Sequence, residues 1–162
     1  MRKTIFLLGC FFILTGSLFL QNIREISAEK AFTQLNEPAT CLIDVRSIAE
    51  YVFVGHPEQS YNIPLHFWNE KEQRMNPNEN FLADILSRFK PEDTLIFICR
   101  SGKRSARAAR TVAAAGFKKV FNLKHGFEGD KDDKGYRSRN GWKNNGLPYT
   151  YVLNDKLVYR NQ

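Results

Sequence analysis

The stretch that decides the fold runs from Thr94 to Ser105 and reads TLIFICRSGKRS. Its first six residues, Thr94 to Cys99, form an apolar run without polar alternation, and such a run indicates a strand that is buried on both faces of a sheet. The residues from Lys103 to Ala115 then carry small side chains at helical spacing along one face, namely Ala106, Ala109 and Ala113. A buried strand that leads straight into a helix is the repeating unit of α/β domains with a parallel sheet.

Strands and helices alternate on either side of this stretch. Apolar runs predict two further strands, Thr40–Val45 and Lys119–Leu123, and a short extended segment at Asn62–Pro64. Apolar residues at helical spacing predict helices over Glu29–Asn36, Ile48–Val54 and Phe81–Phe89. The last stretch, Gly126 to Gln162, is rich in Gly, Asn and charge, which predicts loops and short helices on the surface. We therefore predict an α/β fold with a central parallel sheet and helices on both faces.

Length and charge narrow the class of protein. The chain has 162 residues, which suits one domain, and 24 basic against 17 acidic residues give it a net charge of +7. Apart from a cluster after Cys99 the charges are spread out, and no zinc-finger or RNA-binding pattern accompanies them, so we expect no nucleic-acid partner. His56, His66 and His125 show no metal-ligand spacing, and we expect neither a metal site nor a cofactor.

The first 28 residues have the order of a secretory signal. Arg2 and Lys3 precede an apolar run from Ile5 to Leu20, and a polar stretch then leads to the small residue Ala28. We predict a signal peptide over residues 1–28, a domain over 29–153 and a C-terminal tail over 154–162. The alternative is an uncleaved anchor at residues 5–20 that holds the domain to the inner membrane. In both cases the domain leaves the cytosol, and the periplasm is the expected location.

The segment after Cys99 carries the candidate chemistry. Cys99 stands at the carboxyl end of its strand, where open α/β sheets bind ligands, and the next turn opens a helix. Backbone N–H groups of such a turn form an anion-binding nest, the helix amino terminus adds partial positive charge, and Gly102 permits the turn. These features and three nearby cations favour a thiolate on Cys99 over a thiol. The predicted site is Cys99 as nucleophile with a substrate-binding loop made of Arg100, Ser101, Gly102, Lys103, Arg104 and Ser105. The alternative, an inert buried cysteine, does not account for the cations and the glycine.

The spacing within the loop separates two chemistries. Four residues lie between Cys99 and Arg104. The loop is similar to that of the cysteine phosphatases, which have five, so the cradle here is smaller; it suits one added sulfur atom and crowds a phosphoryl group. We expect Arg100, Lys103 and Arg104 to recruit an anionic donor, with Arg104 closest to the cradle.

The chain resembles the single-domain rhodaneses, which are thiosulfate sulfurtransferases, in their exported bacterial form. The resemblance rests on the loop CRSGKRS and on weaker pieces around it: Leu42–Arg46, Glu50–Tyr51, Gly55–His56, Asn62–Pro64, Gly116–Phe117, Gly126–Phe127, Gly141–Trp142 and Leu147–Pro148. It implies that Cys99 takes a sulfane sulfur from thiosulfate or a similar anion, becomes a persulfide, and passes the sulfur to cyanide or a thiol. A persulfide carrier that serves one partner protein is the alternative function. A phosphatase or arsenate reductase on the same fold is a third reading, which the loop length disfavours.

Supporting residues are expected on the neighbouring strand. Asp44 can accept N–H bonds from the loop or pair with an arginine, and Arg46 and Glu50 can pair across one helical turn. We interpret these contacts as structural. Cys41 begins its strand whereas Cys99 ends a parallel one, so the two lie beyond the reach of a disulfide and both are expected to be free thiols.

Overall fold

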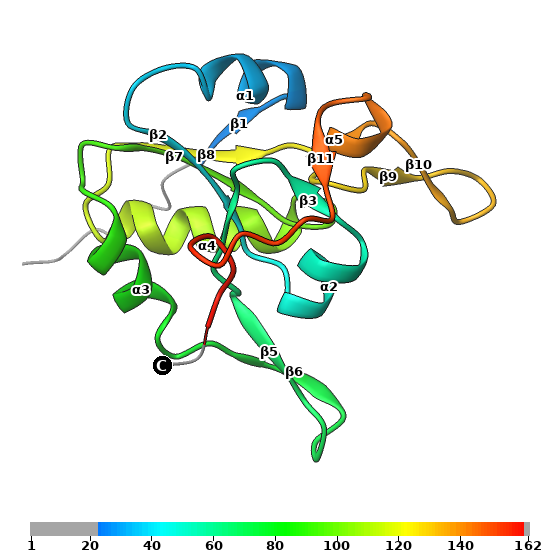
Figure 1. Cartoon of the computed structure of the whole chain (residues 1–162), viewed down its shortest axis with the longest axis horizontal. Coiled ribbons are helices and arrows are strands. Elements are labelled where there is room, and N and C mark those ends of the chain that lie inside the picture. The colour runs from blue at the N-terminus through cyan, green and yellow to red at the C-terminus, as the bar shows by residue number, and fades with distance from the viewer. Residues whose placement is uncertain (1–22, 161–162) are drawn as a thin grey trace, which may run out of the picture.

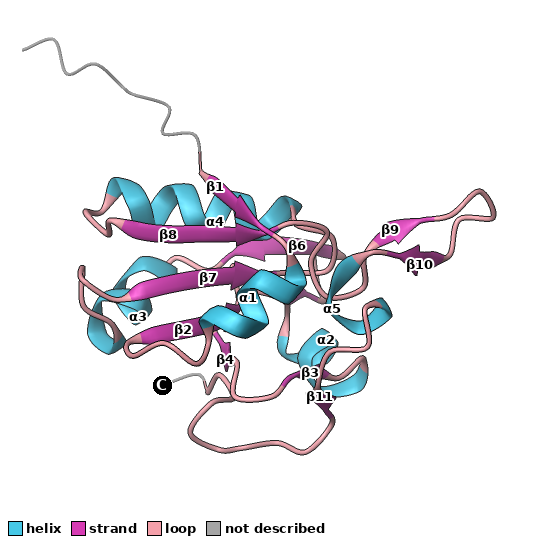
Figure 2. Cartoon of the chain, turned by 90° about the horizontal axis from the view of Figure 1, so that it is seen from above, coloured by secondary structure: helices cyan, strands magenta, loops and turns pink. Residues whose placement is uncertain are grey.

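Strand β7 (Thr94–Ile98) is the middle strand of a five-stranded sheet in the computed structural model of the protein, which describes residues 23–160. The strands follow the order β1-β8-β7-β2-β4 and all pair in parallel (Figure 2). The other four are β1 (Arg24–Ile26), β8 (Lys119–Leu123), β2 (Thr40–Asp44) and β4 (Tyr61–Asn62). The predicted parallel sheet is therefore confirmed.

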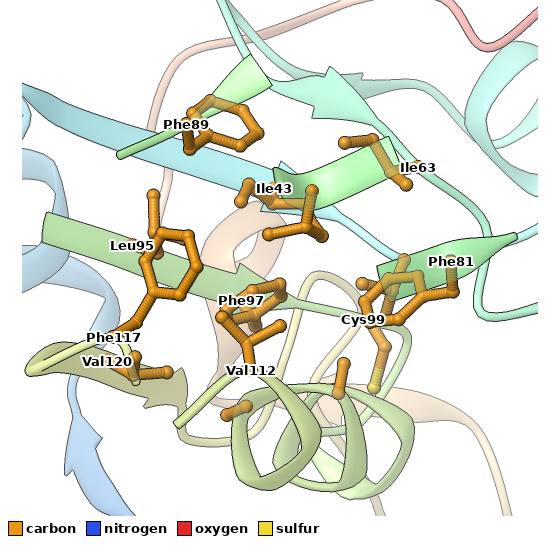
Figure 3. Close-up of a cluster of buried hydrophobic side chains, with 14 residues drawn as sticks. Ile43, Ile63, Phe81, Phe89, Leu95, Phe97, Cys99, Val112, Phe117 and Val120 are labelled. Carbon is orange, nitrogen blue, oxygen red and sulfur yellow. The ribbon is translucent and has the colours of Figure 1, made fainter. Parts of the chain in front are cut away.

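Helices cover both faces of the sheet, as predicted. Helices α3 (Phe81–Arg88) and α4 (Lys103–Ala114) pack on one face, and α1 (Ala28–Gln34) and α5 (Gly141–Asn144) pack on the other. Strand β7 serves both cores: Leu95 and Phe97 point toward α4 (Figure 3), whereas Ile96 and Ile98 belong to the core on the α1 side. This double burial is the physical reason for the unbroken apolar run.

Short elements gather around the carboxyl end of the sheet. They include α2 (Ile48–Phe53) and an antiparallel pair made of β3 (His56–Pro57) and β11 (Tyr149–Thr150). Two hairpins project from the domain in different directions (Figure 1): β5 (His66–Asn69) with β6 (Arg74–Pro77), and β9 (Asp130–Lys131) with β10 (Arg137–Arg139). The sequence does not predict these hairpins, since strands of two to four residues are too short for a periodic signal.

The C-terminal stretch is more deeply packed than predicted. It forms loops and one short helix, as predicted, but also three short strands, and Phe127 and Trp142 are buried in the core on the α1 side of the sheet. The indole Nε1 of Trp142 donates a hydrogen bond of 2.8 Å to the carbonyl oxygen of Pro148. The stretch is therefore part of the core as well as a surface wrap.

The folded unit includes residues on both sides of the predicted range 29–153. Strand β1 lies within the segment predicted as signal peptide, and the side chain of Ile26 is buried beside β8. At the other end, the backbone carbonyl of Leu157 accepts a hydrogen bond from the Asn62 N–H, and the hydroxyl of the buried Tyr159 donates a hydrogen bond to the Asp84 carboxylate.

No helix among residues 23–160 is long and apolar enough to cross a membrane. The apolar run Ile5–Leu20 lies outside the described residues, so the signal peptide and its alternative, the anchor, stay predictions.

Candidate active site

The Cys99 loop is held from outside by the chain that follows β8. The backbone N–H groups of Phe127 and Glu128 donate hydrogen bonds of 2.7 and 3.0 Å to the carbonyl oxygens of Cys99 and Arg100. A side chain at Gly126 would collide with the same two residues, so only glycine allows this close approach. The loop is thus a rigid turn between β7 and α4.

The Cys99 side chain points toward the first turn of α4. Its sulfur is directed at the helix in Figure 3, and Sγ accepts a hydrogen bond of 3.2 Å from the hydroxyl of Ser105. Only 1% of the residue is exposed. Gly102 takes a left-handed conformation (φ 87°) and begins α4, whose amino terminus therefore lies beside the sulfur. A hydroxyl donor and a helix amino terminus both stabilise a thiolate.

Arg104 is clamped beside the loop by Glu50. The guanidinium donates two hydrogen bonds, from Nη1 to Oε2 at 2.7 Å and from Nη2 to Oε1 at 2.5 Å. Oε2 also accepts from the backbone N–H and hydroxyl of Ser47, which begins α2 with a capping box. Burial would raise the pKa of Glu50, but Arg104 and Ser47 outweigh it and lower the pKa to about 2. The expected pairing of Arg46 with Glu50 is wrong, because Arg104 occupies that carboxylate.

Asp44 and Arg46 form a buried pair behind the site. Arg46 donates from Nη2 to Asp44 Oδ2 at 2.6 Å, its backbone N–H bonds Asp44 Oδ1, and both side chains are fully buried. Its guanidinium lies 4.3 Å from the ring centroid of Phe127, the residue whose N–H holds Cys99. Of the two expected roles of Asp44, pairing with an arginine is the one the structure shows. Arg46 thus packs on the residue that holds the loop, and within residues 23–160 neither side chain forms a hydrogen bond with Cys99 Sγ.

The three loop cations therefore have different surroundings. Arg100 and Lys103 are exposed, and neither side chain forms an ion pair or hydrogen bond within residues 23–160. Arg104 is three-quarters buried and already paired. The structure thus leaves Arg100 and Lys103 able to meet an incoming anion, whereas Arg104 first serves to connect α4 to α2.

Sequence reasoning missed two neighbours of the loop. Glu50 was assigned to the wrong arginine, although the Ser47–Glu50 capping box is readable in the sequence. His125, for which the sequence shows only the lack of metal-ligand spacing, takes a left-handed backbone (φ 65°) against Gly102 and pairs with Asp130 at 2.5 Å. No local sequence pattern predicts the His125–Asp130 pair. Within the described part of the chain, no group of three or more His, Cys, Asp or Glu side chains is placed to hold a metal ion.

The two described cysteines are both free thiols, as predicted. Cys41 on β2 is paired in register with Leu95, four residues before Cys99 on β7. At about 3.3 Å per residue this separates the two residues by roughly 13 Å along the strands, well beyond disulfide reach.

A buried cysteine stands at the carboxyl end of the middle strand of a parallel sheet, and a tight turn leads from it into the next helix. The chain belongs to the family of rhodanese-like domains, since residues 27–133 match the family model "Rhodanese-like domain". The family includes sulfurtransferases.

The chain is also similar to curated proteins and to a solved structure. The chain is 34% identical over 131 residues to "Uncharacterized protein RP600" of Rickettsia prowazekii, a match that covers 80% of this chain and 98% of that protein. It is 33% identical over 114 residues to "Thiosulfate sulfurtransferase 18" of Arabidopsis thaliana, covering 70% and 82% of the two chains. The crystal structure of Rv0390 from M. tuberculosis is 34% identical, with a TM-score of 0.67 over 79% of this chain and 97% of that one.

Proposed function

We propose that the protein is a sulfurtransferase that carries a sulfane sulfur as a persulfide on Cys99. The observation that carries the proposal is the small cradle itself: Sγ faces the amino end of α4 with the hydroxyl of Ser105 as donor, and only four residues separate Cys99 from Arg104. The relative named as a thiosulfate sulfurtransferase supports thiosulfate, or a similar anion, as the donor.

The reaction has two balanced steps. The Cys99 thiolate attacks the outer sulfur of thiosulfate, a Cys–S–S⁻ bond forms, the S–S bond of thiosulfate breaks, and its electron pair leaves with sulfite. A nucleophile such as cyanide or a thiolate then attacks the outer sulfur of the persulfide. The new bond gives thiocyanate or an acceptor persulfide, and the electron pair of the broken bond returns to Cys99 as thiolate.

Different residues attract the donor, stabilise the negatively charged sulfur and position the loop. Arg100 and Lys103 attract the dianionic donor, because they are exposed and unpaired in the described part of the chain. The backbone nest and the Ser105 hydroxyl stabilise the negative sulfur before and after transfer. The Glu50–Arg104 clamp holds the loop in the geometry that makes these donors converge.

Intact-mass measurement after incubation with thiosulfate tests the proposal. We expect the gain of one sulfur atom that is lost when cyanide is added, with thiocyanate formed in repeated turnovers. Cys99→Ser should gain none, and Cys41→Ser should gain it normally. Absence of the added sulfur contradicts the proposal. Loading without cyanide turnover identifies a carrier for one partner protein, and hydrolysis of a phosphate ester would favour a phosphatase.

We also propose that the protein is exported, with cleavage before Arg24 and not at Ala28. The support is strand β1, whose pairing with β8 and burial of Ile26 would be lost if the mature chain began near Glu29. Ser27 would be lost as well, and it caps α1 by accepting a hydrogen bond from the Lys30 N–H.

N-terminal sequencing of the protein from its native host tests the cleavage site. As a stability control, removal of residues 1–28 should cost about 2 to 4 kcal/mol relative to removal of residues 1–22, from one buried Ile and one helix cap. Equal stability of the two truncated chains would contradict the structural argument, and an intact Met1 on a cytosolic protein would contradict export.

A further inference from the structure

A hollow with four cations lies on the exposed side of α4, next to the Cys99 loop. Its cationic lining comes from Lys103, Arg107 and Arg110 of α4 and from Lys124, which follows β8. All four side chains are exposed, and within residues 23–160 none forms an ion pair or a side-chain hydrogen bond. Glu25 is the single acidic residue of the described chain in the lining. We call this feature the basic hollow.

The α4 cations form a stripe that starts at the active-site loop. Lys103, Arg107 and Arg110 are spaced i, i+4 and i+7 and so share one face over about 10 Å of helix. Like charges at this spacing repel each other and destabilise the helix, and none of the three forms an ion pair within residues 23–160. The charge of the stripe is therefore available to an extended anionic surface.

The floor of the basic hollow carries an unpaired buried amide. Asn122 on β8 lines the hollow beneath Gly102, with 3% of the residue exposed, and its Oδ1 has no hydrogen-bond partner among the described residues. A buried acceptor without a donor lowers the free energy of unfolding. The hollow therefore has an uncharged polar group in addition to its cations. A simple oxyanion offers only acceptors, whereas a peptide group offers both an N–H and a carbonyl oxygen to a primary amide.

The hollow also touches the catalytic loop, because Ser101 and Gly102 belong to its lining. An occupant would therefore lie against the outer side of the loop whose inner side holds the Cys99 sulfur. We propose that the basic hollow docks an acidic peptide segment of the protein that receives sulfur from Cys99. This inference rests on the proposed sulfurtransferase function and adds to it the chemical class of the acceptor.

Peptide binding tests the docking without any sulfur chemistry. The probe is a fluorescent glutamate-rich peptide that lacks cysteine, compared with the same peptide in which every Glu is Gln, and binding to the full chain is followed by anisotropy. Arg107→Gln/Arg110→Gln should weaken binding of the Glu peptide about fivefold. The matched control, Arg88→Gln/Lys90→Gln, removes two exposed cations at the end of α3 and should leave it within about twofold. Equal loss in both double variants, or equal binding of the Glu and Gln peptides, overturns the proposal.

Asn122 provides a second, independent test. Asn122→Leu replaces the unpaired amide with an apolar side chain of the same branching and number of heavy atoms, so the variant should fold while peptide binding weakens about threefold or more. Unchanged peptide binding in a folded Asn122→Leu variant would show that the Asn122 amide does not contribute to docking. A single-stranded oligonucleotide that competes as well as the Glu peptide, and loses affinity in the same variants, would show a general polyanion surface and overturn the peptide proposal.

The two proposals fail in different ways. If Cys99 gains no sulfur from thiosulfate but the Glu peptide binds with the expected dependence on the hollow, the proposed function is wrong and the docking surface stands. If Cys99 is loaded and turns over cyanide but the peptide does not bind, the docking proposal is wrong alone. When both hold, a glutamate-rich peptide with a cysteine should accept the persulfide sulfur faster than its Gln counterpart, and Arg107→Gln/Arg110→Gln should remove that advantage.

Discussion

Cys41 and Cys99 lie on neighbouring parallel strands, β2 and β7, at opposite ends of the sheet. Cys41 is half-buried at the amino end, where burial raises the pKa of its thiol and the nearby negative charge of Asp93 raises it further. Cys99 is at the carboxyl end, beside the first turn of α4 and the Ser105 hydroxyl. The same residue type thus meets opposite electrostatic surroundings on adjacent strands.

The difference follows from the direction of the chain in an α/β sheet. Each helix that follows a parallel strand begins at the carboxyl edge, so helix amino termini and their unpaired N–H groups gather there. The amino edge receives helix carboxyl termini, as where α3 ends shortly before Asp93 and β7. A thiol at the carboxyl edge therefore faces helix amino termini, whereas a thiol at the amino edge faces helix carboxyl termini.

The largest expected contrast is in catalysis. Cys99→Ser should lower kcat for thiosulfate-to-cyanide transfer about 1,000-fold or more, because the hydroxyl cannot form a persulfide. Cys41→Ser should stay within about twofold, since Cys41 lines a separate pocket near α1. Steady-state kinetics of both variants measures this, with circular dichroism as the control for folding. A large loss in Cys41→Ser would show that both thiols take part.

The second-largest expected difference is in the alkylation rates of the Cys99 and Cys41 thiols. At pH 7 iodoacetamide should modify Cys99 at least about tenfold faster than Cys41, since the thiolate is the reactive form. The Cys41 rate should go on rising above pH 9, because burial and Asp93 raise the pKa of that thiol from 9.0. Peptide mapping after timed alkylation gives both rates, and each Cys→Ser variant confirms the assignment. Faster labelling of Cys41 would contradict the comparison.

The Glu50–Arg104 ion pair lies beside the Cys99 loop and has no counterpart at Cys41 among the described residues. We expect its loss to lower kcat less than the loss of Cys99 does. Glu50→Gln removes the charge that holds Arg104, and the loosened loop should lower kcat about tenfold. Gln keeps an acceptor for the Ser47 N–H, so the variant should fold. Unchanged kcat in Glu50→Gln would show that the backbone contacts from Phe127 and Glu128 position the loop by themselves.

The same variant gives a pH signature. The pKa of Glu50 is lowered in the folded state from 4.5 to about 2, so its ion pair stabilises the protein above pH 4.5 and this contribution is lost as the pH falls toward 2. Thermal unfolding of the wild type should show an extra decrease in Tm across that window that Glu50→Gln lacks. Parallel curves for the two proteins would mean that the carboxylate is not held as described.

The smallest effect is expected for donor recruitment. Lys103→Gln should raise the KM for thiosulfate about threefold and the KM for cyanide less, because the donor is a dianion and the acceptor carries one charge. Added salt should reduce the difference between wild type and variant, since exposed charges are screened over about 8 Å at physiological ionic strength. Initial rates with each substrate varied in turn measure both constants. Equal KM values for thiosulfate would assign the recruitment to Arg100.

Local signals made the strand–loop–helix unit predictable. The run Thr94–Cys99, the glycine at 102 and the alanines of α4 are contiguous, and each reports on the backbone within one or two turns of itself. The predicted helices begin and end within two residues of α1, α2, α3 and α4. The position of Cys99 at a helix amino terminus followed from these elements alone.

The ion-pair partners of the charged side chains could not be predicted from the sequence. Glu50 lies four residues from Arg46 but pairs with Arg104, 54 residues away, because α2 and the start of α4 meet at the same edge of the sheet. Strand β1 is too short for a periodic signal, and its register is set only by pairing with β8. In the sequence, Asn122 lies within an apolar run that predicts a strand. Its position beneath Gly102 depends on how α4 packs on β8.

The amino-acid sequence by itself determined the parallel sheet, the cysteine at its carboxyl edge and the four-residue spacing of the loop, because backbone periodicity and turn chemistry act over neighbouring residues. Only the tertiary structure decided which cations remain unpaired: it gives Arg104 to Glu50, leaves Lys103 exposed, and groups Lys103 with Arg107, Arg110 and Lys124 in one hollow. Ion pairs depend on which elements meet in space, and that is a property of the packed sheet and helices as a whole.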